Sequence, residues 1–99
     1  MFIIREVMQC KPGKVRPLME KFKAFSSAVQ DLGGPPLRLL TDVSGEHFWT
    51  LVIEVPVEAI GDFFAMEERL MTNAAVGKIM AGYHDFVEHG RREVYRVES

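Results

Sequence analysis

The sequence has little of several features that would assign a protein to a specialised class. It contains a single cysteine, Cys10, which excludes an internal disulfide and a cysteine-cluster metal site. No apolar run approaches the roughly 18 residues that a transmembrane helix needs. The 12 basic and 14 acidic residues give a net charge of −2, so the chain lacks the basic excess of a nucleic-acid-binding domain. We therefore expect no membrane span, no nucleic-acid partner and no metal.

The start of the chain carries no export signal. The apolar stretch Met1–Ile4 is followed at once by Arg5 and Glu6, whereas a signal peptide needs an apolar core of about 7–15 residues. A single thiol also suits a compartment in which disulfides are rare. We expect a cytoplasmic protein.

The remaining composition is typical of one folded domain. The chain has 99 residues, of which 47% are apolar and 26% charged. No linker, low-complexity segment or block of like charge interrupts it. Residues 1–99 are therefore expected to form a single domain with its own core.

Apolar periodicity predicts the element order β-α-β-β-α(α)-β. From Val15 to Leu32 the apolar residues follow the i, i+3, i+4, i+7 spacing of one helix face, and Gly33 supplies a stop. Ser44-Gly45-Glu46 separates two extended runs, which is typical of a hairpin. The predicted strands cover 2–9, 37–43, 47–55 and 91–98. The predicted helices cover 15–32, a segment from Pro56 to Met71, and a segment from Thr72 or Asn73 to Val87 with Gly90 after its end.

This order predicts a ferredoxin-like α+β fold. Right-handed crossovers in two β-α-β halves give an antiparallel sheet ordered 4-1-3-2 with its helices on one face. The other face of such a sheet is bare. Alternation along the third strand directs one apolar set toward the helices, namely His47, Trp49, Leu51, Ile53 and Val55. The bare face would then carry Phe48, Val52, Leu40 and Val94, if Leu39 and Tyr95 point inward.

An apolar bare face predicts a partner, because large contiguous apolar patches usually mark interfaces. We expect a homodimer in which two sheets pack face to face. Charged residues would then pair across strands or between subunits, among them Arg38, Glu54, Arg92 and Arg96. A monomer with a partly apolar solvent face is the alternative.

These segments together resemble NIPSNAP-like members of the dimeric α+β-barrel superfamily. The likeness rests on a strand that runs into Lys11-Pro12-Gly13-Lys14 and a long amphipathic helix, and on the closing strand Gly90–Val97. It covers nearly the whole chain. Antibiotic-biosynthesis-monooxygenase-like domains share this fold, so the resemblance includes them.

The resemblance implies a homodimer with one cavity in each subunit, between helices and sheet. Some members of the superfamily catalyse cofactor-independent oxygenation of polyphenols, a subset degrades haem, and others have no assigned activity. The haem-degrading members share an Asn-Trp-His set. Here the second helical region has His84 but no tryptophan, the first strand has no asparagine, and Trp49 lies on the third strand. Haem degradation is therefore not carried over, and no cofactor is expected.

Two neighbouring residues are the candidate catalytic groups. His84 is expected at the edge of the apolar face of the last helix, where a neutral imidazole acts as a general base or ligates a metal. Tyr83 would donate a hydrogen bond to a bound phenol or quinone. An ordinary solvent-facing histidine and a tyrosine at the core edge are the alternatives.

Four further residues are candidates for contacting an apolar ligand: Trp49, His47, Met80 and Phe64. His47 and Trp49 are two apart on one predicted strand and would share a face. The alternatives are that His47 is a solvated turn residue and that Trp49 belongs to the core. His89 is expected at a helix C-terminus, where a cation complements the helix dipole. His84 and His89 are five apart, so they do not form a metal site on one helix face.

Two functions from different classes remain. The first is a NIPSNAP-like homodimer that binds a small apolar or aromatic ligand between helices and sheet. The second is a cofactor-independent monooxygenase acting on polyphenol or quinone-type substrates. The sequence favours the first, because an oxygenase of this kind needs several polar groups directed into one cavity, and no such set is visible.

Overall fold

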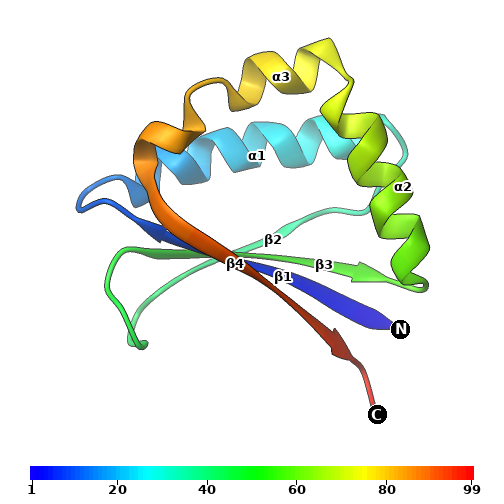
Figure 1. Cartoon of the computed structure of the whole chain (residues 1–99), viewed down its shortest axis with the longest axis horizontal. Helices are drawn as coiled ribbons and strands as arrows, with labels where there is room; N and C mark the ends of the chain where they lie inside the picture. The colour runs from blue at the N-terminus through cyan, green and yellow to red at the C-terminus, as the bar shows by residue number, and fades with distance from the viewer.

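The computed structural model describes residues 1–99 as two layers, a four-stranded sheet with helices on one side (Figure 1). No helix combines the length and the apolar composition that a bilayer span requires. The elements in chain order are β1 (Phe2–Cys10), α1 (Val15–Asp31), β2 (Arg38–Thr41), β3 (Thr50–Val57), α2 (Ile60–Met71), α3 (Ala74–Met80), the 3₁₀ turn η1 (Tyr83–Phe86) and β4 (Val87–Arg96).

The sheet confirms the predicted ferredoxin-like topology. Its strand order is β2-β3-β1-β4, and every neighbouring pair is antiparallel. β1 lies in the centre, with Ile4 opposite Val55 of β3 on one side and Val94 of β4 on the other. α1, α2 and α3 all lie on one face of the sheet, and no element covers the opposite face (Figure 1).

Side-chain alternation separates the two faces in the central strands, as predicted for Leu51, Ile53 and Val55 of the third strand. Ile4 and Cys10 of β1 are 1% exposed, and Leu51, Ile53 and Val55 of β3 are buried under the helices. The opposite positions of both strands form the face without helices, which we call the open face. β1 therefore contributes to both surfaces of the sheet.

The buried core consists of two clusters rather than one. The first lies beneath α2 and α3 and comprises Ile4, Val29, Val55, Phe63, Met66, Leu70 and Val76. The second lies beneath the first half of α1 and comprises Cys10, Leu18, Phe22, Leu51 and Ile53. Three partly buried side chains, Phe25, Leu37 and Met80, pack against both clusters. The space between the clusters is therefore bordered by large flexible and aromatic side chains.

The third strand is shorter at its start than predicted. β3 begins at Thr50, so His47, Phe48 and Trp49 belong to the preceding loop and do not alternate across the sheet. Trp49 has a φ of 60°, which is incompatible with an extended strand. The Asp42 carboxylate accepts a hydrogen bond of 2.8 Å from the Thr50 amide and holds the loop in this shape. Phe48 consequently lies 82% exposed in the loop rather than on the open face.

The second helical region begins later than predicted, because β3 continues to Val57. Pro56 lies within β3 opposite Ile3, not at the start of a helix. β2 pairs only with the earlier part of β3, up to Glu54, so the outer edge of β3 is free at Pro56 and no ladder hydrogen bond is lost there.

The last helix ends earlier than predicted. α3 stops at Met80, and Gly82 follows with a φ of 79°, a conformation that favours glycine. β4 then begins at Val87, so His89 and Gly90 lie in a strand rather than at a helix C-terminus. Pairing of β4 with β1 places Val94 on the helix side and Tyr95 on the open face, the reverse of the prediction. The apolar spacing from Met80 to Val87 suits a helix, but Gly82 breaks it.

A buried serine connects α1 to the start of β2. Ser26 is 9% exposed, and its hydroxyl oxygen accepts a hydrogen bond of 3.1 Å from the Leu37 amide. That contact satisfies a backbone donor in the segment that leads from the helix layer into the sheet.

We predict that Ser26→Ala lowers the free energy of unfolding by about 1–3 kcal/mol, because the Leu37 amide loses its acceptor. Urea unfolding followed by circular dichroism measures the change. Ser27→Ala, at the exposed neighbouring position, is the control and should change the stability by less than about 0.5 kcal/mol. Equal effects of the two substitutions would contradict the role given to the Ser26 hydroxyl.

Candidate functional site

A cavity of about 460 Å³ lies between the helices and the sheet, in the space that separates the two core clusters. Of its 19 lining residues, 15 are hydrophobic, so its interior favours apolar molecules over water. The lining includes members of both clusters and also the shared residues Phe25, Leu37 and Met80.

The cavity has an entrance because the helix layer does not cover the whole sheet. β4 is an edge strand, and its helix-side residue Val94 is 44% exposed.

α3 is held against α1 by Lys21, whose ammonium donates to the carbonyl oxygens of Ile79 at 3.3 Å and Ala81 at 2.8 Å. A cation at the last carbonyls of a helix also complements the helix dipole. This contact positions Met80 at the cavity wall.

Three charged residues from three elements lie together at the cavity: Glu6 of β1, Glu67 of α2 and Arg92 of β4. Arg92 donates through Nε to Glu6 and through Nη2 to Glu67, the latter at 2.6 Å. Its guanidinium also lies 4.9 Å from the centre of the Phe63 ring. Their side chains are 26%, 34% and 36% exposed respectively, so the trio lies between the apolar interior and water.

These contacts keep Arg92 charged. Burial lowers the pKa of its guanidinium, but the hydrogen bonds that it donates to Glu6 and Glu67 act in the opposite direction and the pKa is raised overall. Arg92 therefore acts as a fixed cation that holds two carboxylates, and it does not exchange protons at neutral pH.

Two of the predicted site residues line this cavity. Tyr83 of η1 and Met80 of α3 both contribute to its wall. Phe64 does not, because consecutive helix residues point in different directions and Phe63 takes the inward position on α2. The Phe64 ring is 51% exposed and lies 5.6 Å from the Phe63 ring.

His84 is outside the cavity. It lies exposed on η1, and its ring lies against that of Tyr83 with 3.9 Å between the ring centres. The histidine thus contacts the outer side of a cavity residue but lines none of the interior. A proton transfer by His84 inside the cavity has no geometric basis.

His47 and Trp49 do not line the cavity either, and they do not share a face. His47 borders a hollow on the open face, whereas Trp49 borders a separate and more open hollow of about 780 Å³ beside the start of α1. The strand prediction placed them together, and the loop that ends at Trp49 separates them. No three side chains of His, Cys, Asp or Glu lie close enough to hold a metal ion.

The cysteine offers no nucleophile to the cavity. Cys10 is 1% exposed at the end of β1, and it packs in the second core cluster. Burial raises the pKa of its thiol, and the negative charge of Asp42 raises it further. The polar groups that line the cavity are therefore two carboxylates, one guanidinium and one phenol, which donate or accept hydrogen bonds.

Sequence reasoning missed Glu6, Glu67 and Arg92 as a group, because they come from three segments far apart in the chain. One signal was present. In β1 the inward set Phe2, Ile4, Glu6 and Met8 is apolar except for Glu6, and a carboxylate facing a helix layer needs a partner. The partner is Arg92, which lies directly opposite Glu6 in the β1–β4 pairing.

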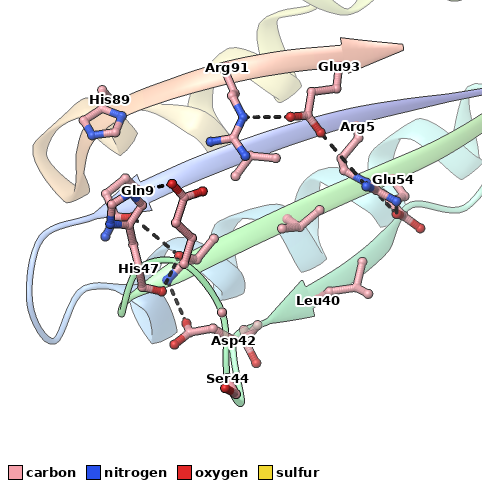
Figure 2. Close-up of a pocket in the computed structure, with 16 residues that line it drawn as sticks. Arg5, Gln9, Leu40, Asp42, Ser44, His47, Glu54, His89, Arg91 and Glu93 are labelled. Atoms are coloured by element: carbon pink, nitrogen blue, oxygen red, sulfur yellow. Dashed lines mark hydrogen bonds and ion pairs between the residues drawn. The ribbon is translucent and has the colours of Figure 1, made fainter. Parts of the chain in front are cut away.

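The open face carries a row of alternating charges across all four strands. Arg38 of β2, Glu54 of β3, Arg5 of β1 and Glu93 of β4 are directly opposite one another in the ladder. Figure 2 shows Arg5 between the two carboxylates, with Arg91 beyond Glu93. Arg5 lies 2.6 Å from Glu54 and 4.0 Å from Glu93, and Arg38 lies 3.7 Å from Glu54.

Glu93, at the β4 end of this row, is strongly paired. Hydrogen bonds from Arg91, and then from Tyr95, lower the pKa of the Glu93 carboxyl. A hollow of about 330 Å³ extends beside the row toward the loop 42–47, where His47 and His89 border it (Figure 2). Arg38 and Glu54 pair across strands as predicted, and Arg92 pairs across strands with Glu6 on the helix side. Arg96 also lies on the helix side, where its guanidinium lies 5.7 Å from the centre of the Phe2 ring.

Comparison with known proteins shows what this arrangement resembles. No protein-family model and no curated protein matches the sequence. An uncharacterized NIPSNAP domain protein from Burkholderia xenovorans matches the structure with a TM-score of 0.84 and 16% identity, over 100% of this chain and 96% of that one.

The chain has the fold of the NIPSNAP domain proteins. A NIPSNAP family protein of unknown function from Agrobacterium tumefaciens matches with a TM-score of 0.83 and 14% identity, over 98% of this chain and 87% of that one. A candidate antibiotic biosynthesis monooxygenase from Nitrosomonas europaea matches over 100% of both chains, with a TM-score of 0.74 and 14% identity. The resemblance stated from the sequence is thus confirmed at the level of the NIPSNAP-type fold.

Proposed function

We propose that this NIPSNAP-like protein binds a small apolar or aromatic molecule in the cavity between its helices and its sheet. The observation that carries the proposal is the cavity itself, about 460 Å³ in volume with 15 hydrophobic residues in its lining. Small-molecule sites are typically apolar hollows of about 300–1,000 Å³ with a few polar groups that orient the ligand. Glu6, Glu67, Arg92 and Tyr83 are those polar groups.

The lining of the cavity also argues for an occupant. The cavity is half open, so its apolar lining faces water when no ligand is present. A ligand that fills the space between Phe25, Val76 and Met80 would remove that apolar surface from water. The incomplete helix cover beside β4 gives it a way in.

The glycine at position 77 allows a direct test. Gly77 lines the cavity, and open space surrounds the position that a Cβ would take. We predict that Gly77→Leu weakens the binding of 4-phenylbutan-1-ol by about tenfold or more, because the new side chain occupies ligand volume. Isothermal titration calorimetry measures the dissociation constant.

The matched control is Gly61→Leu. Gly61 also lies in a helix with open space around its Cβ position, but it does not line the cavity. Both substitutions replace a helical glycine and should be neutral or stabilising. Binding that Gly77→Leu leaves unchanged, or that both variants weaken equally, would contradict the assignment of the cavity as the site.

We also propose that the protein is a homodimer through the open face. Two apolar rows flank the charged row on this face. One row runs along Leu40, Val52 and Val7, and the other along Pro56, Ile3 and Tyr95. An antiparallel sheet can leave a polar face in water, but apolar side chains on that face favour a second layer, and a second copy of the same face supplies one.

The charged row is compatible with such an interface. Its carboxylates Glu54 and Glu93 are already paired within the chain, with Arg5 between them. Burying paired charges costs much less than burying an isolated one, and two facing rows of alternating sign favour one orientation over others.

We predict that Val52→Asp converts the dimer to a monomer. Val52 lies near the middle of the open face, and desolvating an unpaired carboxylate there costs several kcal/mol, enough to raise the dissociation constant by about a hundredfold or more. Analytical ultracentrifugation at micromolar concentration gives the mass. Val94→Asp, which places the same change on the opposite side of the sheet, should remain dimeric. A monomeric wild-type protein would contradict the proposal.

A cofactor-independent monooxygenase acting on polyphenol or quinone-type substrates is the second candidate. The observation in its favour is that Tyr83 lines the same apolar cavity as Glu6, Glu67 and Arg92, which gives the set of polar groups that the reaction needs.

A cytoplasmic location, where the Cys10 thiol stays reduced, suits either function.

Oxygen consumption with a panel of quinols tests the second candidate. If the protein is an oxygenase, Tyr83→Phe should slow turnover by about 100-fold or more, a typical effect of losing an acid–base group. His84→Ala should leave turnover unchanged, because the His84 side chain does not line the cavity. No oxygen uptake by the wild-type protein with any quinol would remove this candidate and leave ligand binding.

A further inference from the structure

The charges at the cavity suggest which ligands it accepts, provided that the cavity is a ligand site as proposed above. Among its lining residues only Glu6, Glu67 and Arg92 are charged, so the lining carries one more negative charge than positive. The three lie together at one side of an otherwise apolar space. A ligand that enters with its apolar part first therefore leaves its polar end beside this trio.

The cation of the trio is already engaged. Arg92 contacts Glu6 through Nε and Glu67 through Nη2, and its Cζ lies 4.9 Å from the centre of the Phe63 ring. These contacts fix the guanidinium from three sides. Nη1 of Arg92 has no partner within the protein, but a carboxylate ligand placed there would lie beside two glutamates of like charge, which is unfavourable.

Each of the two carboxylates, in contrast, has one oxygen without a hydrogen bond. Glu6 uses Oε1 and Glu67 uses Oε2 for Arg92, while Oε2 of Glu6 and Oε1 of Glu67 accept no hydrogen bond within the protein. Both side chains are only about one third exposed or less, at 26% and 34%. A protonated amine placed between them would supply donors to the spare oxygens and neutralise the excess negative charge.

We infer that the cavity selects apolar molecules with a cationic amine at one end and discriminates against carboxylates of the same carbon skeleton. The trio acts as a charge filter, in which Arg92 holds the two glutamates close together and their excess negative charge determines the preference. Binding energy comes from the apolar cavity, and the choice of head group comes from the trio.

Three probes that differ only in the head group test the inference: 4-phenylbutan-1-amine, 4-phenylbutan-1-ol and 4-phenylbutanoate. Calorimetry at pH 7 should rank their affinities in that order. We expect the amine to bind at least about tenfold more tightly than the carboxylate, since one favourable and one unfavourable charge interaction differ by more than about 1.4 kcal/mol at this exposure.

Two glutamine variants test the origin of the ranking. Glu67→Gln keeps a hydrogen-bond acceptor for Arg92 but removes the excess charge, so the ratio of amine to carboxylate affinity should fall about tenfold toward unity. Glu68→Gln is the matched control, because Glu68 is exposed on the same helix, does not line the cavity and changes the net charge of the protein equally. Its ratio should equal that of the wild type.

The outcomes separate this inference from the proposed function. If none of the three probes binds, the cavity is not a site for small apolar molecules and both proposals fail. If the alcohol binds but the carboxylate binds as tightly as the amine, the charge filter is wrong and ligand binding stands. An amine preference that Glu67→Gln and Glu68→Gln reduce equally would also overturn the filter, because it would then reflect the charge of the whole protein.

Discussion

The alternation of side chains along β1 is the constraint on which the rest of the structure depends. Neighbouring residues in this central strand point to opposite faces, so Arg5 extends to the open face and Glu6 to the helix layer. Arg5 joins Glu54 and Glu93 into the charged row, and Glu6 holds Arg92 at the cavity. A slip of one residue would exchange both sets and bury the wrong side chains. One pair of residues therefore defines the polar part of both proposed interfaces, one toward a second subunit and one toward a ligand.

The division of the core into two clusters explains why a domain of this size has room for a ligand. α1 covers the second cluster and α2 with α3 covers the first, and only Phe25, Leu37 and Met80 join them. A single well-packed core would leave no such space. The long bare edge along β4 adds the entrance, and Arg92 on that strand places the charged trio beside it. The same incomplete cover thus leaves the proposed site open to solvent.

The sequence predicted the layers well, because each depends on local periodicity. The inward set Leu51, Ile53 and Val55 and the amphipathic α1 follow from spacings within one segment, and the strand order follows from the order of the elements and right-handed crossovers. The element boundaries that were predicted wrongly depend on single backbone conformations. Trp49 adopts a positive φ that its residue type disfavours, and Gly82 ends a helix whose apolar spacing continues beyond it. The trio at the cavity was not predicted, for a third reason. Glu6, Glu67 and Arg92 are brought together only by tertiary structure, and no motif in the chain marks them.

We propose that the space between the two core clusters is a ligand site whose polar end lies at Arg92, Glu6 and Glu67. A crystal structure of the protein grown with 4-phenylbutan-1-amine would show where the ligand and its head group lie. We expect the phenyl ring between Phe25, Val76 and Met80, and the ammonium within hydrogen-bond distance of Glu67. A collapsed cavity without ligand density, or the amine bound only on the open face, would contradict it.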